Sequence, residues 1–285
     1  MTDTVLSMTD VGKSFRRTRV LDNCTLDVRR GSVTALVGSN GAGKSTMMSL
    51  VVGLLSPDSG SISVLGEPVG QRGIASGLSY LAQHKPLYPR FTVDEMLRFG
   101  RSTNDSWDDA YAAELVDASG ISRSARVKSL SPGHRTRVAL ALALGRRPEV
   151  LLLDEPLADL DPVARREVAQ TLMRDAAEHG TTIVMSSHVL SELADVADTL
   201  MLLREGRIQL TGALDEITSE HFVLVGTGQT SSVVGNATVI SEAIGSGGTT
   251  FIVRGTRPTS APGWQIETAT LDDVVLAYLS NRSAT

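Results

Sequence analysis

The chain has 285 residues, of which 41% are hydrophobic and 21% are charged, and its formal net charge is -5. This composition is typical of a globular protein with a sizeable core, and it excludes an intrinsically disordered chain. Proteins that bind nucleic acid neutralise its phosphates with clustered lysine and arginine, and this chain has no such basic excess. We therefore expect no nucleic-acid partner.

Cysteine content and hydropathy indicate in which cellular compartment the protein is located. Cys24 is the single cysteine, so the chain can form neither an internal disulfide nor a cysteine metal cage, which fits a reducing cytosol. The opening Met1–Thr4 lacks the basic start and apolar stretch of a secretory signal. No run approaches the roughly 18 apolar residues that cross a bilayer. We expect a cytoplasmic chain that reaches a membrane only through a partner.

Short apolar runs alternate along the chain with longer segments of helical period, which predicts an α/β fold with a largely parallel sheet. Val33–Val37, Val150–Leu153 and Thr182–Met185 are apolar at consecutive positions, as expected for buried central strands. The length suits one large domain with a smaller appendage, since single domains usually hold on the order of 100–200 residues.

A phosphate-binding loop follows the first of these strands and precedes an apolar-faced helix over Met47–Val52. Its residues are Gly38, Ser39, Asn40, Gly41, Ala42, Gly43, Lys44, Ser45 and Thr46. The glycines let successive backbone N–H groups turn toward an anion, and the helix start adds the positive end of its dipole. We expect Lys44 to bridge the β- and γ-phosphates and the Ser45 hydroxyl to bind Mg²⁺.

Polar side chains follow three further predicted strands. Gln83 comes after Leu78–Ala82, the pair Asp154 and Glu155 after Val150–Leu153, and His188 after Thr182–Ser187. Ligands of open parallel sheets lie beyond the carboxyl ends of the strands, so these side chains are expected at one site. We expect Asp154 to hold Mg²⁺ through water and Glu155 to act as a general base on the attacking water. Taken singly, Gln83 and His188 are equally explained as ordinary surface or core residues.

Composition changes after Gly212. The stretch Gly226–Thr250 is rich in glycine, serine and threonine, whereas Thr250–Val253 resembles a strand and Leu271–Leu279 an amphipathic helix. We expect a small C-terminal α+β domain over residues 216–285. A partly ordered tail is the alternative.

The motifs in their order resemble the ATP-binding cassette (ABC) family, the ATPase subunits of ABC transporters. The resemblance covers residues 4–215 and rests on the following segments: Gly38–Thr46, Gln83, Leu130–His134, Leu151–Pro156, Asp159–Asp161 and His188. It implies an ATPase domain at residues 1–215 with a helical signature subdomain at about 84–145, and ATP and Mg²⁺ as bound groups.

The resemblance also assigns roles to single residues. Gln83 matches the glutamine that senses Mg²⁺ and the membrane partner, and His188 matches the histidine that contacts the γ-phosphate. Asp161 matches the loop acid that communicates between subunits. Phe15 falls where an aromatic ring stacks on adenine, although a lone phenylalanine near a strand is also explained as core.

The signature segment departs from the usual Leu-Ser-Gly-Gly-Gln, because Pro132 and His134 replace two of its residues. Ser131 and Gly133 are retained, and the resemblance places them at the γ-phosphate bound by a second subunit. Pro132 suits the first turn of a helix, where its missing N–H costs little.

The resemblance implies two partners: a second copy of the chain, since one set of motifs is present, and a separate transmembrane permease. Leu271–Leu279 resembles the closing helix of subunits in the drug- and antibiotic-export branch. Three alternatives remain: the ATPase of an importer, a soluble ABC-type ATPase with a non-membrane partner, and a cassette that binds ATP without turnover.

Overall fold

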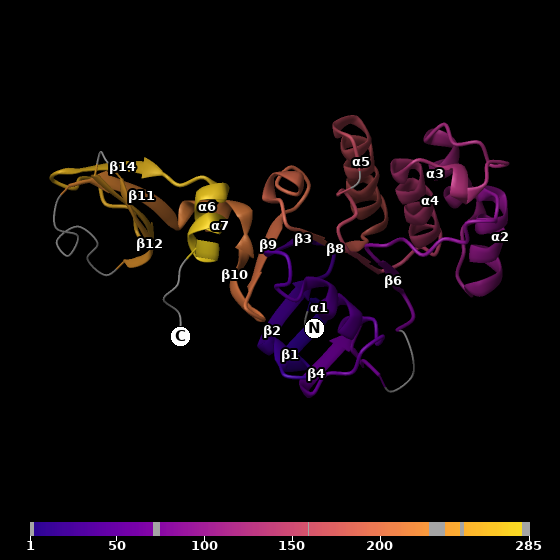
Figure 1. Cartoon of the computed structure of the whole chain (residues 1–285), viewed down its shortest axis with the longest axis horizontal. Helices are drawn as coiled ribbons and strands as arrows, with labels where there is room; N and C mark the ends of the chain where they lie inside the picture. The colour runs from indigo at the N-terminus through magenta and orange to yellow at the C-terminus, as the bar shows by residue number, and fades with distance from the viewer. Residues whose placement is uncertain (1–2, 71–74, 159, 228–236, 246–247, 281–285) are drawn as a thin grey trace.

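The strands of the computed structural model form three sheets (Figure 1) within the residues that it describes: 3–70, 75–158, 160–227, 237–245 and 248–280. The central sheet has six strands in the order β10-β9-β3-β8-β7-β6. The strands span Val33–Val37 (β3), Leu78–Leu81 (β6), Val150–Leu153 (β7), Thr182–Ser187 (β8), Thr199–Arg204 (β9) and Arg207–Ala213 (β10). All neighbours pair in parallel except β10, which is antiparallel to β9. The prediction of an α/β fold with a mixed, largely parallel sheet is confirmed.

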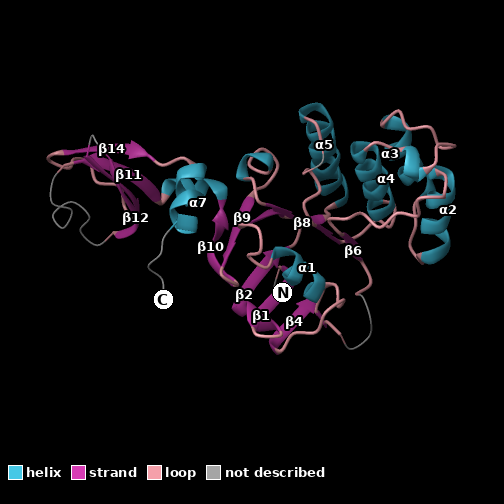
Figure 2. Ribbon diagram, in the orientation of Figure 1, coloured by secondary structure: helices cyan, strands magenta, loops and turns pink. Residues whose placement is uncertain are grey.

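Every residue of β3, β7 and β8 is buried, because helices or a second sheet cover both faces of the central sheet. An antiparallel sheet of order β2-β1-β4-β5 lies on one side (Figure 2), and helix α1, Lys44–Val51, packs between the two sheets. Its strands span Thr4–Phe15 (β1), Thr18–Arg29 (β2), Ser59–Val64 (β4) and Glu67–Pro68 (β5). Met47, Met48 and Leu50 of α1 fill the core that the two sheets share.

The predicted helical subdomain consists of α2, α3 and α4, which span Val93–Thr103, Asp109–Ala118 and Pro132–Leu144. A capping box of Thr92 and Glu95 begins α2, and the Ser131 side chain caps α4. These helices enclose their own core, in which Met96 and Leu97 are buried, whereas Phe99 is exposed. Helix α5, Pro162–His179, continues the layer across the central sheet.

The C-terminal part forms an antiparallel sheet of order β12-β13-β11-β14. Its elements span Leu214–Ser219 (α6), His221–Gly226 (β11), Thr238–Gly245 (β12), Gly248–Arg254 (β13), Trp264–Thr268 (β14) and Leu271–Ser280 (α7). The predicted strand and helix both occur. Residues 228–236 and 246–247 of the Gly/Ser/Thr-rich stretch lie outside the described residues.

The expected boundary between residues 215 and 216 falls inside α6, so the junction is a helix and not an open linker. The α6 residue Ile217 and the α7 residues Val274 and Val275 join the core of the central sheet. The Arg204 guanidinium of β9 also donates to the Tyr278 carbonyl at 2.7 Å. The C-terminal sheet is therefore anchored to the cassette by buried packing.

No helix in the described part of the chain is both long and apolar enough to span a membrane.

A buried carboxylate ties α3 to α5. Asp175 of α5 is 1% exposed and accepts hydrogen bonds from the Tyr111 hydroxyl at 2.8 Å and the Thr181 hydroxyl at 2.6 Å. The Arg147 guanidinium lies 3.6 Å from the Tyr111 ring centroid. Burial, and then the neighbouring Asp175, raise the pKa of Tyr111, so its hydroxyl remains a donor.

Removing this donor should weaken the junction between α3 and α5. We expect Tyr111→Phe to lower the free energy of unfolding by about 1.5–3 kcal/mol, because a buried carboxylate loses a hydrogen bond. Urea titration measures the change. Tyr88→Phe is the control, since that side chain is exposed. Equal losses in both variants would contradict the prediction.

Candidate functional site

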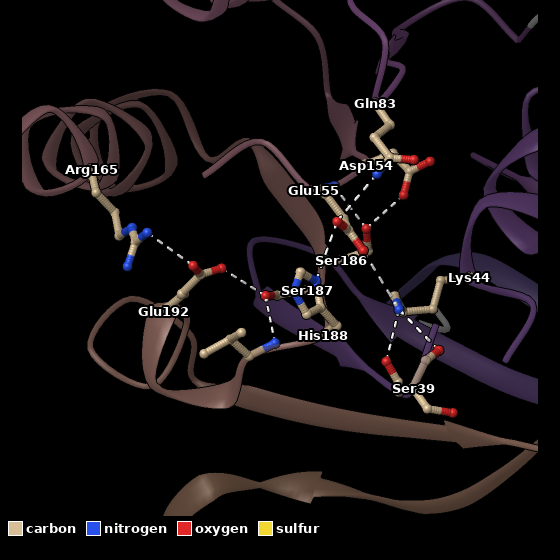
Figure 3. A network of polar contacts seen from close by, with 12 residues as sticks. Ser39, Lys44, Gln83, Asp154, Glu155, Arg165, Ser186, Ser187, His188 and Glu192 are labelled. Atoms are coloured by element: carbon tan, nitrogen blue, oxygen red, sulfur yellow. Dashed lines mark hydrogen bonds and ion pairs between the residues drawn. The ribbon is translucent and has the colours of Figure 1, made fainter. Parts of the chain in front are cut away.

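The polar residues predicted from the sequence meet at the carboxyl edge of the central sheet (Figure 3). In the parallel register, Leu81 pairs with Leu153, Leu153 with Met185, and Val37 with Ser187. The loops after β6, β7, β8 and β3 therefore start close together. This edge is where ligands bind in open parallel sheets.

The loop Gly38–Thr46 turns tightly between β3 and α1, and two of its glycines are required by geometry. A Cβ on Gly38 would lie 2.3 Å from the Leu203 carbonyl oxygen. Gly43 caps α1 with φ of 109°, a conformation that other residues rarely adopt. The remaining loop residues are exposed Ser39, Asn40, Gly41 and Ser45, buried Ala42 and half-buried Thr46.

Lys44 lies at the centre of this loop and is 5% exposed. Its ammonium donates to the carbonyl oxygens of Gly38 at 2.7 Å and Ser39 at 3.3 Å, and lies 3.7 Å from Glu155 Oε1. Burial lowers the pKa of Lys44, while the carboxylates of Glu155 and Asp154 oppose this shift. The carbonyl oxygens of the loop thus hold the Lys44 ammonium in place. Phosphate oxygens can replace these carbonyls as its hydrogen-bond acceptors.

The acidic pair at the end of β7 is held by a serine that sequence reasoning did not identify. The Ser186 hydroxyl donates to Asp154 Oδ1 at 2.7 Å and accepts from the Glu155 backbone N–H at 2.9 Å. Asp154 is 2% exposed. Glu155 has φ of 47°, and such left-handed conformations in non-glycine residues concentrate at functional sites. The two serines that end the apolar run of β8 were the available signal.

The Glu155 carboxylate contacts the other three predicted catalytic residues. Its Oε2 accepts from Gln83 Nε2 at 3.3 Å and lies 3.3 Å from His188 Nδ1, while its Oε1 faces Lys44. The Glu155 side chain is largely buried, whereas His188 is 40% exposed. One carboxylate is therefore in contact with a cation, an amide and an imidazole from three different loops.

The residues predicted for Mg²⁺ are Ser45, Gln83 and Asp154. Asp154 Oδ1 is occupied by Ser186, which leaves Oδ2, and the Ser45 hydroxyl makes no hydrogen bond to another described residue. Among the described residues, no three acidic, histidine or cysteine side chains cluster as a metal cage. Mg²⁺ commonly binds through one or two protein oxygens together with substrate phosphates, and this donor set fits that mode.

Four predicted residues lie outside the network around Glu155. Phe15, at the turn between β1 and β2, is 44% exposed, so it is not a core residue, and the Lys13 ammonium lies 5.6 Å from its ring centroid. Ser131 accepts from the His134 backbone N–H at 3.1 Å. A Cβ on Gly133 would meet only ordinary contacts.

The fourth residue, Asp161, caps helix α5 and accepts from the backbone N–H groups of Val163 and Ala164. These bonds, that from Ala164 foremost, lower the pKa of Asp161. Asp159 of the same motif lies outside the described residues. Within the described chain, no hydrogen bond or ion pair connects Ser131, Gly133 or Asp161 to Glu155.

Comparisons with known proteins agree on one family. A family model described as ABC transporter matches residues 21–158, and a model for an AAA domain of a Type IV TA system matches residues 123–194. The hypophosphite import ATP-binding protein of Stutzerimonas stutzeri is 33% identical over 78% of this chain and 70% of its own length. The Nod factor export ATP-binding protein I of Bradyrhizobium diazoefficiens is 35% identical over 78% of this chain and 74% of its own.

The solved structures give the same result. The ATP-binding subunit of an ABC transporter superposes with a TM-score of 0.68 and 28% sequence identity. The match covers 75% of this chain and 92% of the solved chain.

Loss of the Ser186 hydroxyl should affect both stability and chemistry. We expect Ser186→Ala to lower the free energy of unfolding by about 1.5–3 kcal/mol, because Asp154 loses a buried donor. We expect nucleotide hydrolysis to slow roughly 10- to 100-fold, because the acidic pair loses its support. Phosphate release and denaturant titration measure the two effects.

Thr182→Val is the matched control on the same strand. The Thr182 hydroxyl is buried at the opposite end of β8 and accepts from the Gly31 N–H at 2.9 Å. This variant should lose stability and keep the hydrolysis rate. If both variants slowed hydrolysis equally, Ser186 would have no specific role.

Proposed function

This chain belongs to the family of ABC transporter ATP-binding subunits, and we propose that it drives a separate membrane permease that exports a drug-, antibiotic- or lipid-like compound. Subunits of this family hydrolyse ATP to power transport. The observation that carries the proposal is the convergence of Lys44, Gln83 and His188 on the Glu155 carboxylate beside the phosphate loop.

The triphosphate binds in the loop Gly38–Thr46. Backbone N–H groups of the loop and of the first turn of α1 donate to the β- and γ-phosphates, where the helix dipole also favours negative charge. The Lys44 ammonium exchanges the Gly38 and Ser39 carbonyls for phosphate oxygens. The exposed ring of Phe15 offers a face on which adenine stacks.

Hydrolysis uses Glu155 as general base. The carboxylate accepts a proton from a water molecule as the water oxygen attacks the γ-phosphorus, and the bond from that phosphorus to the ADP oxygen breaks. Gln83 and His188, which contact Glu155 Oε2, orient the water and the γ-phosphate. Ser45, Gln83 and Asp154 would hold Mg²⁺, which would supply positive charge against the phosphate oxygens. Ser186 keeps Asp154 and Glu155 in place throughout.

A second copy of the chain completes the site. Ser131 and Gly133 lie at the exposed start of α4, and Asp161 lies at the exposed start of α5. No described neighbour requires a glycine at position 133, because a Cβ there would make only ordinary contacts, with Leu160 at 3.5 Å and Ser131 Oγ at 3.9 Å. The missing side chain leaves room for nucleotide held by another subunit to approach this turn. A closed two-fold pair satisfies both sites at once.

The helical subdomain carries an aromatic cluster suited to the permease. The rings of Tyr88, Phe91 and Phe99 contact each other with centroids 5.0–6.5 Å apart, and Tyr88 and Phe99 are exposed. Exposed aromatic groups of this kind favour a protein interface. Only four residues separate Gln83 from Tyr88, the first ring of the cluster, so this short segment connects the permease surface to the catalytic carboxylate. When the aromatic cluster is bound to the permease, the chain lies at the cytoplasmic face of the membrane.

Export is favoured by the short C-terminal domain with its closing helix α7. The named relatives include an import protein and an export protein, so family membership leaves both directions open. An importer ATPase is therefore the second candidate.

Removing the general base should separate ATP binding from hydrolysis. We expect Glu155→Gln to reduce the hydrolysis rate roughly 10²- to 10⁴-fold and to accumulate an ATP-bound dimer, because the γ-phosphate bridge persists. Phosphate release and size-exclusion chromatography with ATP measure these effects. Glu149→Gln is the control, since Glu149 pairs with Arg30 on the surface. A variant that stayed monomeric with ATP would argue against the shared site.

The direction of transport can be measured in inverted membrane vesicles. The vesicles contain this chain together with its permease, and a panel of fluorescent amphiphilic compounds is supplied outside. We expect ATP-dependent accumulation inside, because the inverted bilayer exposes the ATPase and export then runs inward. Vesicles with Glu155→Gln are the control. ATP-dependent loss of preloaded compound would identify an importer instead.

A further inference from the structure

We propose that Arg165 and Glu192 form a positioning pair that sets the place of His188 and links it to the loop that ends at Asp161. The inference rests on the proposed role of His188 beside Glu155. Arg165 and Glu192 do not themselves belong to the network around Glu155. The contacts run in an unbroken series from α5 to the end of β8 (Figure 3).

Glu192 is the middle member of the series. Its Oε1 forms an ion pair with Arg165 Nη2 at 3.0 Å, and its Oε2 accepts from the Ser187 hydroxyl at 2.8 Å. The Glu192 side chain is 8% exposed, so the ion pair is poorly screened by solvent. Both carboxylate oxygens are used, which fixes the orientation of the group.

The Ser187 hydroxyl passes this restraint to the backbone around His188. It donates to Glu192 and accepts from the Val189 N–H at 2.9 Å. The two ends of this hydrogen-bonded turn therefore flank His188 in the chain. The imidazole itself is 40% exposed, and its one ion-pair contact within the described part of the chain is with Glu155. Its direction thus depends on how this turn is held.

Arg165 connects the turn to the loop before α5. Besides Glu192, its Nη2 lies 3.4 Å from the Leu160 carbonyl oxygen. Leu160 directly precedes Asp161, and the Arg165 backbone N–H bonds to the Asp161 carbonyl in the first turn of α5. One guanidinium therefore contacts both the loop expected at the subunit interface and the carboxylate that supports the His188 turn.

Two further observations indicate that the Arg165 guanidinium can change its position. Its Nε is buried and has no hydrogen-bond partner among the described residues, an arrangement that native interiors generally avoid. Arg165 and Glu192 also line a cavity of about 300 Å³ with Arg166, Met173 and Val196. The guanidinium therefore has room to shift. A displacement of the Asp161 loop by a second subunit would move Arg165, then Glu192, and so redirect His188.

The test is steady-state ATP hydrolysis by the full chain with Arg165→Met, which removes the charge and keeps the methylene stem. We expect kcat to fall about tenfold with KM within about twofold of wild type, because binding groups are untouched. Glu192→Gln should give the same pattern, and Arg165→Lys should recover part of the loss. Arg166→Met is the matched control, since Arg166 is exposed on the same helix turn. It should leave kcat unchanged.

A double-mutant cycle with His188→Ala, measured under single-turnover conditions, decides whether Arg165 acts through the imidazole. We expect Arg165→Met to slow the His188→Ala variant less than about twofold. An undiminished tenfold effect in that background would overturn the positioning role and leave the proposed function intact. If His188→Ala alone hydrolysed ATP at the wild-type rate, the proposed role of His188 would fail instead. Thermal unfolding of each variant separates both results from loss of fold, and Glu192→Gln replaces Arg165→Met if the latter is unfolded.

Discussion

The parallel register of β3, β6, β7 and β8 is the constraint on which the site depends. Because these strands run in one direction and end together, four loops that are far apart in sequence deliver their first polar residues to one place. The strands are almost completely buried, so a shift of register would expose apolar faces and is strongly disfavoured. The precision of the site therefore comes from the core beneath it.

Charge balance shapes the site itself. Asp154 and Glu155 are both largely buried and adjacent, and the ammonium of Lys44 lies within reach of one of them. Burial disfavours the charged form of Lys44, as its lowered pKa shows, and the two carboxylates oppose this shift. A bound triphosphate would bring negative charge that Lys44 offsets, together with Mg²⁺ in the proposed mechanism. The network around Glu155 is thus arranged for a ligand that carries its own counterion.

Residues of the proposed subunit interface also have structural roles within the chain. Ser131 caps α4 and Asp161 caps α5, so both side chains stabilise helix starts. The caps use the backbone N–H groups of His134, Val163 and Ala164 in the first turns of these helices. The Arg165 and Glu192 pair extends this arrangement, since it joins one of these helix starts to the His188 turn. In the proposed dimer, each chain thus contributes to both nucleotide sites.

The sequence by itself determined the fold class, the phosphate loop, the acidic pair and the family, because each depends on residues close together in the chain. Glycine spacing, an apolar strand followed by acids, and helix-capping residues carry local physical requirements that need no distant partner. The tertiary structure alone decided that Ser186 holds both Asp154 and Glu155, and that α6 bridges the expected domain boundary. It also decided that Arg165 meets Glu192. These contacts join residues 27 to 32 positions apart through strand pairing and helix packing, so no local pattern encodes them.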